Sequence, residues 1–157
     1  MKQIWAPWRM EYIQKEKAGG CVLCEAPGQD NDALNHILYR GNKNFVIMNR
    51  YPYNTGHLMI VPYRHIASLE ELTDEERQEH FDIVSRSIKV LRQVLSPGGF
   101  NLGINIGKVA GAGIEDHVHT HIVPRWQGDT NFMPVIADVR VVPEALTETY
   151  QKLKGKF

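Results

Sequence analysis

The residues most suited to chemistry lie at 115–124, which read EDHVHTHIVP and hold three of the chain's seven histidines. His117, His119 and His121 occupy every second position. Successive side chains of a β-strand point to opposite faces, so this spacing predicts an extended segment with three imidazoles on one face. Same-face neighbours lie about 7 Å apart, roughly the span of a phosphate group. We therefore expect a functional site here rather than three separate structural histidines.

Two chemistries suit three imidazoles on one strand. His-x-His is a common ligand spacing for zinc, copper or iron, and a three-histidine site with an open position would make a metal-dependent hydrolase. Alternatively, a neutral imidazole attacks a phosphoanhydride and forms a covalent intermediate, which requires donors to the phosphate oxygens. The glycine-rich residues 107–113 can bring backbone N–H groups to an anion and favour this second chemistry. Asn101 and Asn105 on the adjoining segment favour it too.

Strand-like patterns surround this stretch. Short apolar runs at 37–39 and 45–48 flank a Gly/Asn turn and predict a β-hairpin. Further strands are expected at 57–62, 100–106 and 139–142. In 100–106 the even-numbered apolar residues are expected to face the core, and the odd-numbered small polar residues are expected to form a ligand floor.

One long helix is predicted from residue 73 onward. Thr73 and Glu76 have the capping-box pattern. Apolar residues then recur at spacings of three and four, which indicates an amphipathic helix whose core positions are Phe81, Val84, Ile88, Leu91 and Leu95. Residues 96–99 should end it, and His80 is expected on its surface. Pro143 is expected to open a C-terminal helix over 144–154.

Three other stretches carry weaker expectations. The aromatic residues 1–14, with Trp5 and Trp8, should pack on the body or on a second subunit. Residues 26–36 are polar and turn-rich, which predicts a mobile loop with a structural or exposed His36. Cys21 and Cys24 form a C-x-x-C pair between expected loops, which indicates a metal half-site or two thiols rather than a disulfide.

Composition limits the class of protein. The 157 residues fit one domain, and 43% hydrophobic with 23% charged residues is ordinary for a globular protein. Lysine plus arginine equals aspartate plus glutamate at 18 each, so no net field favours a nucleic acid polymer or a membrane. No apolar run approaches the roughly 20 residues of a membrane span, and the first residues lack the apolar core of a signal peptide. A cytoplasmic location is expected.

Three stretches of the sequence resemble those of a known family. Residues 117–123, HVHTHIV, resemble the His-φ-His-φ-His-φ-φ motif of the histidine triad (HIT) superfamily, with Thr120 where an apolar residue is usual. Residues 45–65 resemble the family's nucleoside-binding strand-loop-strand. Residues 4–9 (IWAPWR) and 124–126 (PRW) are similar to the bacterial branch that includes diadenosine-tetraphosphate phosphorylases.

The resemblance implies a fold and an assembly. The fold is α+β and HIT-like, with an antiparallel sheet, one long packed helix and a C-terminal helix. A single HIT domain would span 1–157, with an N-terminal arm at 1–18 and a helical extension at 143–157. The assembly would be a homodimer.

The resemblance also implies roles. His119 would attack the α-phosphate of a nucleotide, His121 would donate to phosphate oxygens, and His57 would orient these neighbours. Asn49 falls on the ribose-binding position, and Gly113 replaces a glutamine that many hydrolase members carry. The implied nucleotide or phosphate contacts are Asn49, Asn105, Gly113, His117 and Trp126, the last stacking on a second base.

In some relatives two such cysteines bind a structural zinc ion, and the resemblance then implies the ligands Cys21, Cys24, His65 and His117. Zinc would remove His117 from the acid–base set, whereas the alternative is two unligated thiols. The partners expected are an adenine nucleotide substrate and a second copy of the chain, with no nucleic acid polymer or membrane.

The predicted function is a nucleotidyl-histidine enzyme that cleaves dinucleoside polyphosphates, as a phosphorylase if the acceptor is inorganic phosphate or as a hydrolase if it is water. The alternatives are a nucleoside phosphoramidate or nucleotide hydrolase of the same family, a zinc hydrolase that uses the three histidines as ligands, and a nucleotide-binding module without turnover.

Overall fold

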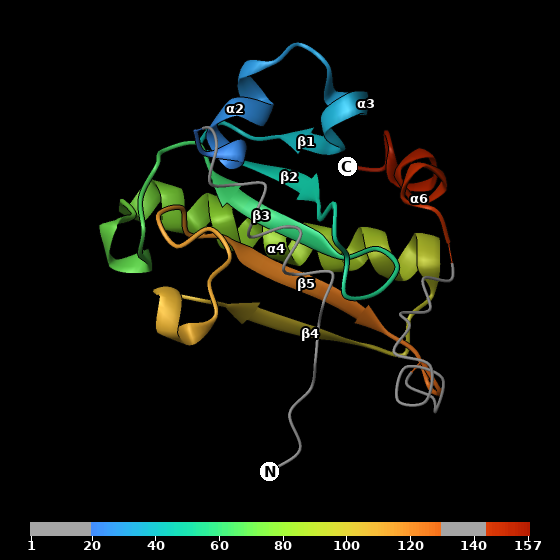
Figure 1. Cartoon of the computed structure of the whole chain (residues 1–157). Helices are drawn as coiled ribbons and strands as arrows, with labels where there is room; N and C mark the ends of the chain where they lie inside the picture. The colour runs from blue at the N-terminus through green and yellow to red at the C-terminus, as the bar shows by residue number, and fades with distance from the viewer. Residues whose placement is uncertain (1–19, 130–143) are drawn as a thin grey trace.

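The computed structural model describes residues 20–129 and 144–157. In this part of the chain, five antiparallel strands form one sheet in the order β1-β2-β3-β5-β4 (Figure 1). The strands are β1 (Ile37–Arg40), β2 (Asn44–Met48), β3 (Leu58–Pro62), β4 (Gly99–Ile104) and β5 (Thr120–Arg125). The α+β class and the antiparallel sheet are confirmed. The strand expected at 139–142 and the arm at 1–18 lie outside the described residues.

Strands β2 and β3 make the buried centre of the sheet. Every residue of β2 and of β3 is buried, because helices cover both strands and each has a hydrogen-bonded strand on either side. β3 pairs with β5 through Leu58–Ile122, Met59–His121 and Ile60–Thr120. The start of β5, which carries part of the histidine motif, is therefore anchored in the middle of the sheet.

The long helix α4 (Asp74–Leu95) runs across one face of the sheet (Figure 1). It begins with the predicted capping box: the Thr73 hydroxyl accepts from the Glu76 backbone N–H, and the Glu76 carboxylate accepts from the Thr73 N–H. Its buried stripe includes Val84 and Leu91, as predicted.

Two expectations for α4 were wrong. Phe81 is 53% exposed, and His80 is buried at 1% rather than lying on the surface. The buried stripe also contains three polar residues that an apolar periodicity cannot reveal: Glu76, His80 and Ser87.

Shorter helices flank the sheet. The loop expected at 26–36 is instead largely helical, with α2 (Val22–Gly28) and α3 (Asp32–Asn35). The C-x-x-C pair accordingly opens a helix, because Cys21 is the N-cap of α2 and Cys24 lies in its first turn. α6 (Leu146–Leu153) confirms the C-terminal helix and packs on α4. None of the described helices has the length and apolar content needed to cross a bilayer.

The edge strand β4 is less covered than its pattern indicated. Leu102 is 48% exposed and Ile106, just beyond the strand, is 44% exposed. The helix packs on β2, β3 and β5, so the apolar face of the edge strand receives only partial cover. The expectation that the even-numbered residues of 100–106 form core was therefore wrong for these two.

Candidate active site and metal cluster

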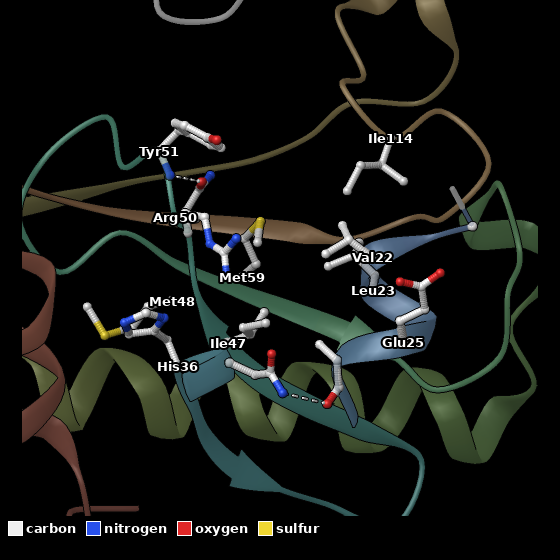
Figure 2. Close-up of a pocket in the computed structure, with 14 residues that line it drawn as sticks. Val22, Leu23, Glu25, His36, Ile47, Met48, Arg50, Tyr51, Met59 and Ile114 are labelled. Carbon is white, nitrogen blue, oxygen red and sulfur yellow. Dashed lines mark hydrogen bonds between the residues drawn. The ribbon is translucent and has the colours of Figure 1, made fainter. Parts of the chain in front are cut away.

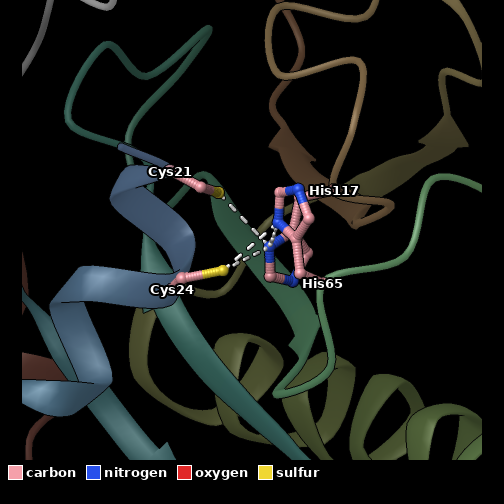
Figure 3. A group of neighbouring side chains, drawn as sticks. All are labelled: Cys21, Cys24, His65 and His117. Atoms are coloured by element: carbon pink, nitrogen blue, oxygen red, sulfur yellow. Dashed lines mark hydrogen bonds between the residues drawn. The ribbon is translucent and has the colours of Figure 1, made fainter. Parts of the chain in front are cut away.

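The three histidines of the motif do not share one strand face. β5 begins only at Thr120, and the backbone N–H of Val118 donates to the Ile66 carbonyl at 2.7 Å instead of to a neighbouring strand. His119 and His121 stay together, with ring centroids 4.7 Å apart. His117 turns away toward Cys21 and Cys24 (Figure 3). The motif therefore supplies two separate sites.

His119 is oriented by the main chain. Its Nδ1 lies 2.8 Å from the His117 carbonyl oxygen, so Nδ1 carries the hydrogen and donates it. In the neutral ring, Nε2 then holds the lone pair. Burial lowers the pKa of His119 below its usual value, against the opposing effect of the hydrogen bond to His117. A buried, neutral imidazole with a defined nucleophilic nitrogen results.

His57 and His121 form a directed pair. The Tyr53 backbone N–H donates to His57 Nδ1 at 2.9 Å, so a neutral His57 carries its hydrogen on Nε2. That Nε2 lies 2.9 Å from His121 Nδ1 and donates to it. A neutral His121 must then carry its hydrogen on Nε2. The tautomer of His121, assigned from this hydrogen-bond network, makes Nε2 a donor.

A small cavity of about 40 Å³ is lined by five of the predicted catalytic and nucleotide-binding residues, whereas His57, His117 and Trp126 do not line it. It is lined by Asn49, Tyr51, Tyr53, Met59, Asn105, Gly113, His119 and His121. The glycine-rich segment delivers Gly113 to this cavity after η3 (Lys108–Ala110), and Gly107 and Gly111 adopt positive φ values of 81° and 87° around that turn. Asn105, His119 and His121 thus meet as expected.

A larger cavity of about 290 Å³ adjoins the small one, since Asn49, Tyr51 and Met59 line both. Much of its wall is apolar, with Val22 and Leu23 of α2 facing Ile47 and Met59 of the sheet (Figure 2). The Asn49 side-chain oxygen accepts from the Tyr51 N–H at 2.8 Å. In the described part of the chain its amide nitrogen has no partner, which leaves a donor at the junction of the two cavities.

The four predicted metal ligands form one cluster (Figure 3). His117 Nδ1 lies 3.3 Å from Cys21 Sγ, 3.4 Å from Cys24 Sγ and 3.3 Å from His65 Nδ1. All four candidate ligand atoms lie within 4.8 Å of one another. Zinc–sulfur bonds of about 2.3 Å and zinc–nitrogen bonds of about 2.0 Å give tetrahedron edges of about 3.3–3.8 Å. The donor set and its spacing therefore fit a tetrahedral zinc ion.

The protonation of the cluster fits a metal as well. His117 Nε2 lies 2.8 Å from the Pro62 carbonyl oxygen and donates to it, which leaves the Nδ1 lone pair aimed at the cysteines. Desolvation and the neighbouring Cys21 raise the pKa of the Cys24 thiol to about 11. A bound divalent cation would reverse this tendency, because zinc ligation deprotonates thiols.

The sequence analysis did not predict a role for Tyr53, and it predicted a contact for Trp126 that the two cavities do not include. Tyr53 was not expected to contribute, yet its ring stacks on His57 with centroids 4.8 Å apart. The tyrosines and prolines of residues 51–53 mark only a loop, so no signal in the sequence could have identified this role. Trp126 lines neither of the two cavities in the described structure.

Comparisons with known proteins show the family of the chain. The HIT domain family model matches residues 31–128. AP-4-A phosphorylase of Mycobacterium tuberculosis is 37% identical over all of this chain and 85% of its own length. The asymmetrical bis(5'-nucleosyl)-tetraphosphatase of Schizosaccharomyces pombe is 33% identical over 59% of this chain and 50% of its own length.

A solved structure shows the same fold. The Zn-bound histidine triad family protein from Mycobacterium smegmatis superposes with a TM-score of 0.69 at 27% identity, covering 87% of this chain and 92% of that one. Because the family model spans more than half of the sequence and the phosphorylase is 37% identical over all of this chain, the chain belongs to the HIT domain family.

Proposed function

We propose that this chain is a nucleotide-processing enzyme that cleaves dinucleoside polyphosphates by attack of His119 on an α-phosphate. The observation that carries the proposal is the orientation of His119, whose Nδ1 donates to the His117 carbonyl and whose Nε2 therefore keeps its lone pair. The ring lines the small cavity beside His121. Similarity to AP-4-A phosphorylase along the whole chain supports this substrate class.

The histidine pair supplies the donor for the charge that develops on phosphorus. With diadenosine tetraphosphate, the new bond joins His119 Nε2 to the α-phosphorus, and the bond to the bridging oxygen breaks to release ATP. The Nε2 hydrogen of His121, set by His57, donates to a phosphate oxygen. Asn105 and Gly113, which line the same cavity, contact the remaining oxygens.

The nucleoside occupies the larger cavity. Its apolar wall suits the flat face of a purine, and Asn49 lines its junction with the small cavity, which supports a ribose bound at that point. The Asn49 amide nitrogen then donates to a ribose hydroxyl. Trp126 stays a prediction as a stacking surface for a second base.

In the second step the nucleotidyl group leaves His119 for an acceptor. Inorganic phosphate yields ADP and water yields AMP. We favour phosphate, because Gly113 stands where the resemblance places a glutamine in many hydrolases, and because the relative matched over the full chain is a phosphorylase.

The cluster of Cys21, Cys24, His65 and His117 holds a structural zinc ion in this proposal. All four positions are filled by protein donors, so no site is left for a water nucleophile. The Zn-bound relative supports the assignment. The ion stabilises thiolates and links α2 to the segment before β5; the reacting groups remain His57, His119 and His121.

A homodimer completes the proposal. β4 is an edge strand of the described sheet, and edge strands with exposed apolar residues favour pairing with another chain. Leu102, Ile106 and Val109 are exposed on and just after this strand. A second copy of the chain would cover them.

Product analysis tests the function. The protein is incubated with diadenosine tetraphosphate, with and without inorganic phosphate, beside His119→Asn. The asparagine amide can still donate to the His117 carbonyl but lacks the nucleophile. We expect ADP and ATP from wild type only when phosphate is present, and neither from the variant.

The other outcomes discriminate between the alternatives. AMP and ATP without phosphate would make the enzyme an asymmetrical hydrolase on the same histidine. Turnover of adenosine phosphoramidate alone would favour the nucleoside phosphoramidate hydrolase. AMP binding without turnover of any of these substrates would leave a nucleotide-binding module and overturn the proposal.

A further inference from the structure

A buried chain of polar groups lies beneath the start of β5 and is absent from the mechanism above. His80 of α4 is 1% exposed, and both of its ring nitrogens have partners. Nδ1 lies 2.8 Å from Asn44 Oδ1 in β2, and Nε2 lies 2.7 Å from the Thr120 hydroxyl in β5. Asn44 is 0% and Thr120 is 4% exposed. These hydrogen bonds therefore connect β2 to β5 through a side chain of α4.

The donors and acceptors in this row of buried side chains can be assigned in one direction. The Asn44 amide nitrogen donates to the Glu79 carboxylate at 3.0 Å and to the Glu76 carbonyl at 3.2 Å, which fixes the amide orientation. Asn44 Oδ1 must then accept, so His80 Nδ1 is the donor. A neutral His80 accepts at Nε2, and the Thr120 hydroxyl donates to it. Burial favours this neutral form by lowering the pKa of His80 to about 4.

Thr120, the last residue in this row of hydrogen-bonded side chains, lies between the two reacting histidines in the sequence. Thr120 separates His119 from His121, and adjacent side chains of an extended segment point to opposite sides. Thr120 is also the first residue of β5, where its backbone pairs with Ile60 on one side and Ile104 on the other. The Thr120 side chain therefore leaves the backbone toward His80, on the side opposite to its neighbours His119 and His121.

A purely structural role does not require these polar groups. An apolar side chain at position 120 would fill the same space without desolvating a hydroxyl, and an apolar residue at 80 would pack against it. A hydrogen bond differs from apolar packing in that it has a preferred direction and length. Directionality is what a site needs when its reacting groups must be held within a fraction of an ångström.

We propose that His80 and Thr120 are positioning residues, whose hydrogen bond fixes the start of β5 and thereby aligns the His119 and His121 imidazoles with the α-phosphate. The inference rests on the proposed function for its kinetic consequence. Its structural consequence, a defined arrangement of the two imidazoles, is measurable without turnover.

The first test compares Thr120→Val with Thr120→Ser. Valine has the shape of threonine and removes the hydroxyl, whereas serine keeps the hydroxyl and removes only the methyl group. With diadenosine tetraphosphate and inorganic phosphate, we expect Thr120→Val to lower kcat by about 10- to 100-fold with KM within about twofold. Thr120→Ser should recover most of kcat. Equal kcat values for wild type and Thr120→Val well below their melting temperatures would overturn the proposal.

A second variant separates alignment from stability. Thr120→Val leaves His80 Nε2 buried without a donor, which can destabilise the fold. The double variant His80→Leu/Thr120→Val replaces both partners with apolar groups and removes that penalty, while Asn44 Oδ1 loses the donor that His80 Nδ1 supplies. Assayed well below its melting temperature, the double variant is expected still to have a low kcat. A stable double variant with wild-type kcat would show that the pair serves packing alone.

Nitrogen NMR of the histidine side chains keeps the inference independent of the reaction. In wild type, His119 should show the tautomer with hydrogen on Nδ1, and His121 the tautomer with hydrogen on Nε2. We expect exchange broadening or mixed tautomers at both in Thr120→Val, and wild-type signals in Thr120→Ser. Mixed tautomers in a protein that turns over no substrate would support the alignment while refuting the proposed function; unchanged signals in Thr120→Val would refute the alignment.

Discussion

The carbonyl oxygen of His117 accepts a hydrogen bond from His119 Nδ1 at 2.8 Å, while the side chain of the same His117 belongs to the Cys2His2 cluster. Its ring is held on both sides, by the Pro62 carbonyl at Nε2 and by the cysteines near Nδ1. One residue thus connects a metal-binding geometry to the orientation of the proposed nucleophile. The metal cluster and the proposed reaction site use different side chains, but the backbone of His117 connects them.

Loss of the metal should therefore disturb catalysis as well as stability. In wild type, atomic emission should find one zinc ion per chain. We expect Cys24→Ser to lose this ion and to melt at a lower temperature. Because His117 would no longer be fixed, kcat should fall about tenfold or more. A Cys24→Ser protein that retains one zinc ion per chain would exclude the cluster as the binding site.

The pair of His57 and His121 predicts an effect on kcat. In His57→Ala, His121 Nδ1 loses its donor, so the tautomer with hydrogen on Nε2 is no longer favoured and donation to phosphate weakens. We expect kcat to fall about 100-fold, in the range typical of lost acid–base groups. Steady-state kinetics with diadenosine tetraphosphate and phosphate provides the measurement.

His57→Gln is the matched control, because its amide can accept from the Tyr53 N–H and donate to His121 as the imidazole does. It should recover part of the lost rate. A kcat for His57→Ala within twofold of wild type would contradict the directed pair.

Buried His80 predicts a loss of stability in mild acid. Its pKa is about 4 in the fold against 6.5 for an ordinary histidine, so between these values the unfolded chain binds more protons at this residue. The free energy of unfolding therefore falls as the pH drops from 6.5 to 4, by at most about 3 kcal/mol from this group. Urea unfolding at a series of pH values measures the slope.

The control for this slope is His80→Gln, which can donate to Asn44 and accept from Thr120 but does not titrate. The pKa of His119 is also lowered by burial and contributes to the same window in both proteins. The difference between the two slopes isolates His80. Parallel slopes would mean that His80 is not buried as a neutral ring.

The exposed edge strand predicts a change of assembly. Wild type should have the mass of two 17.9 kDa chains in light scattering, and Leu102→Glu should have the mass of one, since a carboxylate on β4 opposes burial against a second copy. Leu34→Glu is the control, because Leu34 is 63% exposed on α3, outside this edge. A monomeric wild type, or a dimeric Leu102→Glu, would place the interface elsewhere or remove it.

Local patterns in the sequence determined a large part of this protein. The hairpin of β1 and β2, the capped helix α4 and the helix α6 follow from spacing, turn residues and caps, which act over a few residues. The motif at 117–121 indicated the family, and the chemistry proposed here rests on that resemblance. The ligand set of Cys21, Cys24, His65 and His117 was available through the resemblance, and the structure brings these four residues together.

The tertiary structure decided which way each histidine turns. Periodicity placed His117, His119 and His121 on one strand face. In the structure the Val118 backbone N–H donates to the Ile66 carbonyl, and β5 begins only at Thr120. The His117 side chain therefore lies beside the cysteines instead. Sequence spacing cannot reveal this, because the competing hydrogen bond comes from residues more than fifty positions away. Sequence spacing cannot reveal the small cavity of the proposed reaction either, because residues from several separate segments line it.

His80 shows the limit of hydrophobic periodicity most directly. A polar side chain in an amphipathic helix is assigned to the solvent side unless its partners are known. Here the partners are Asn44 and Thr120, contributed by two strands that the helix meets only in the folded protein. A buried polar group is stable only when it is hydrogen-bonded, and whether such bonds form depends on distances between segments that the sequence alone does not specify.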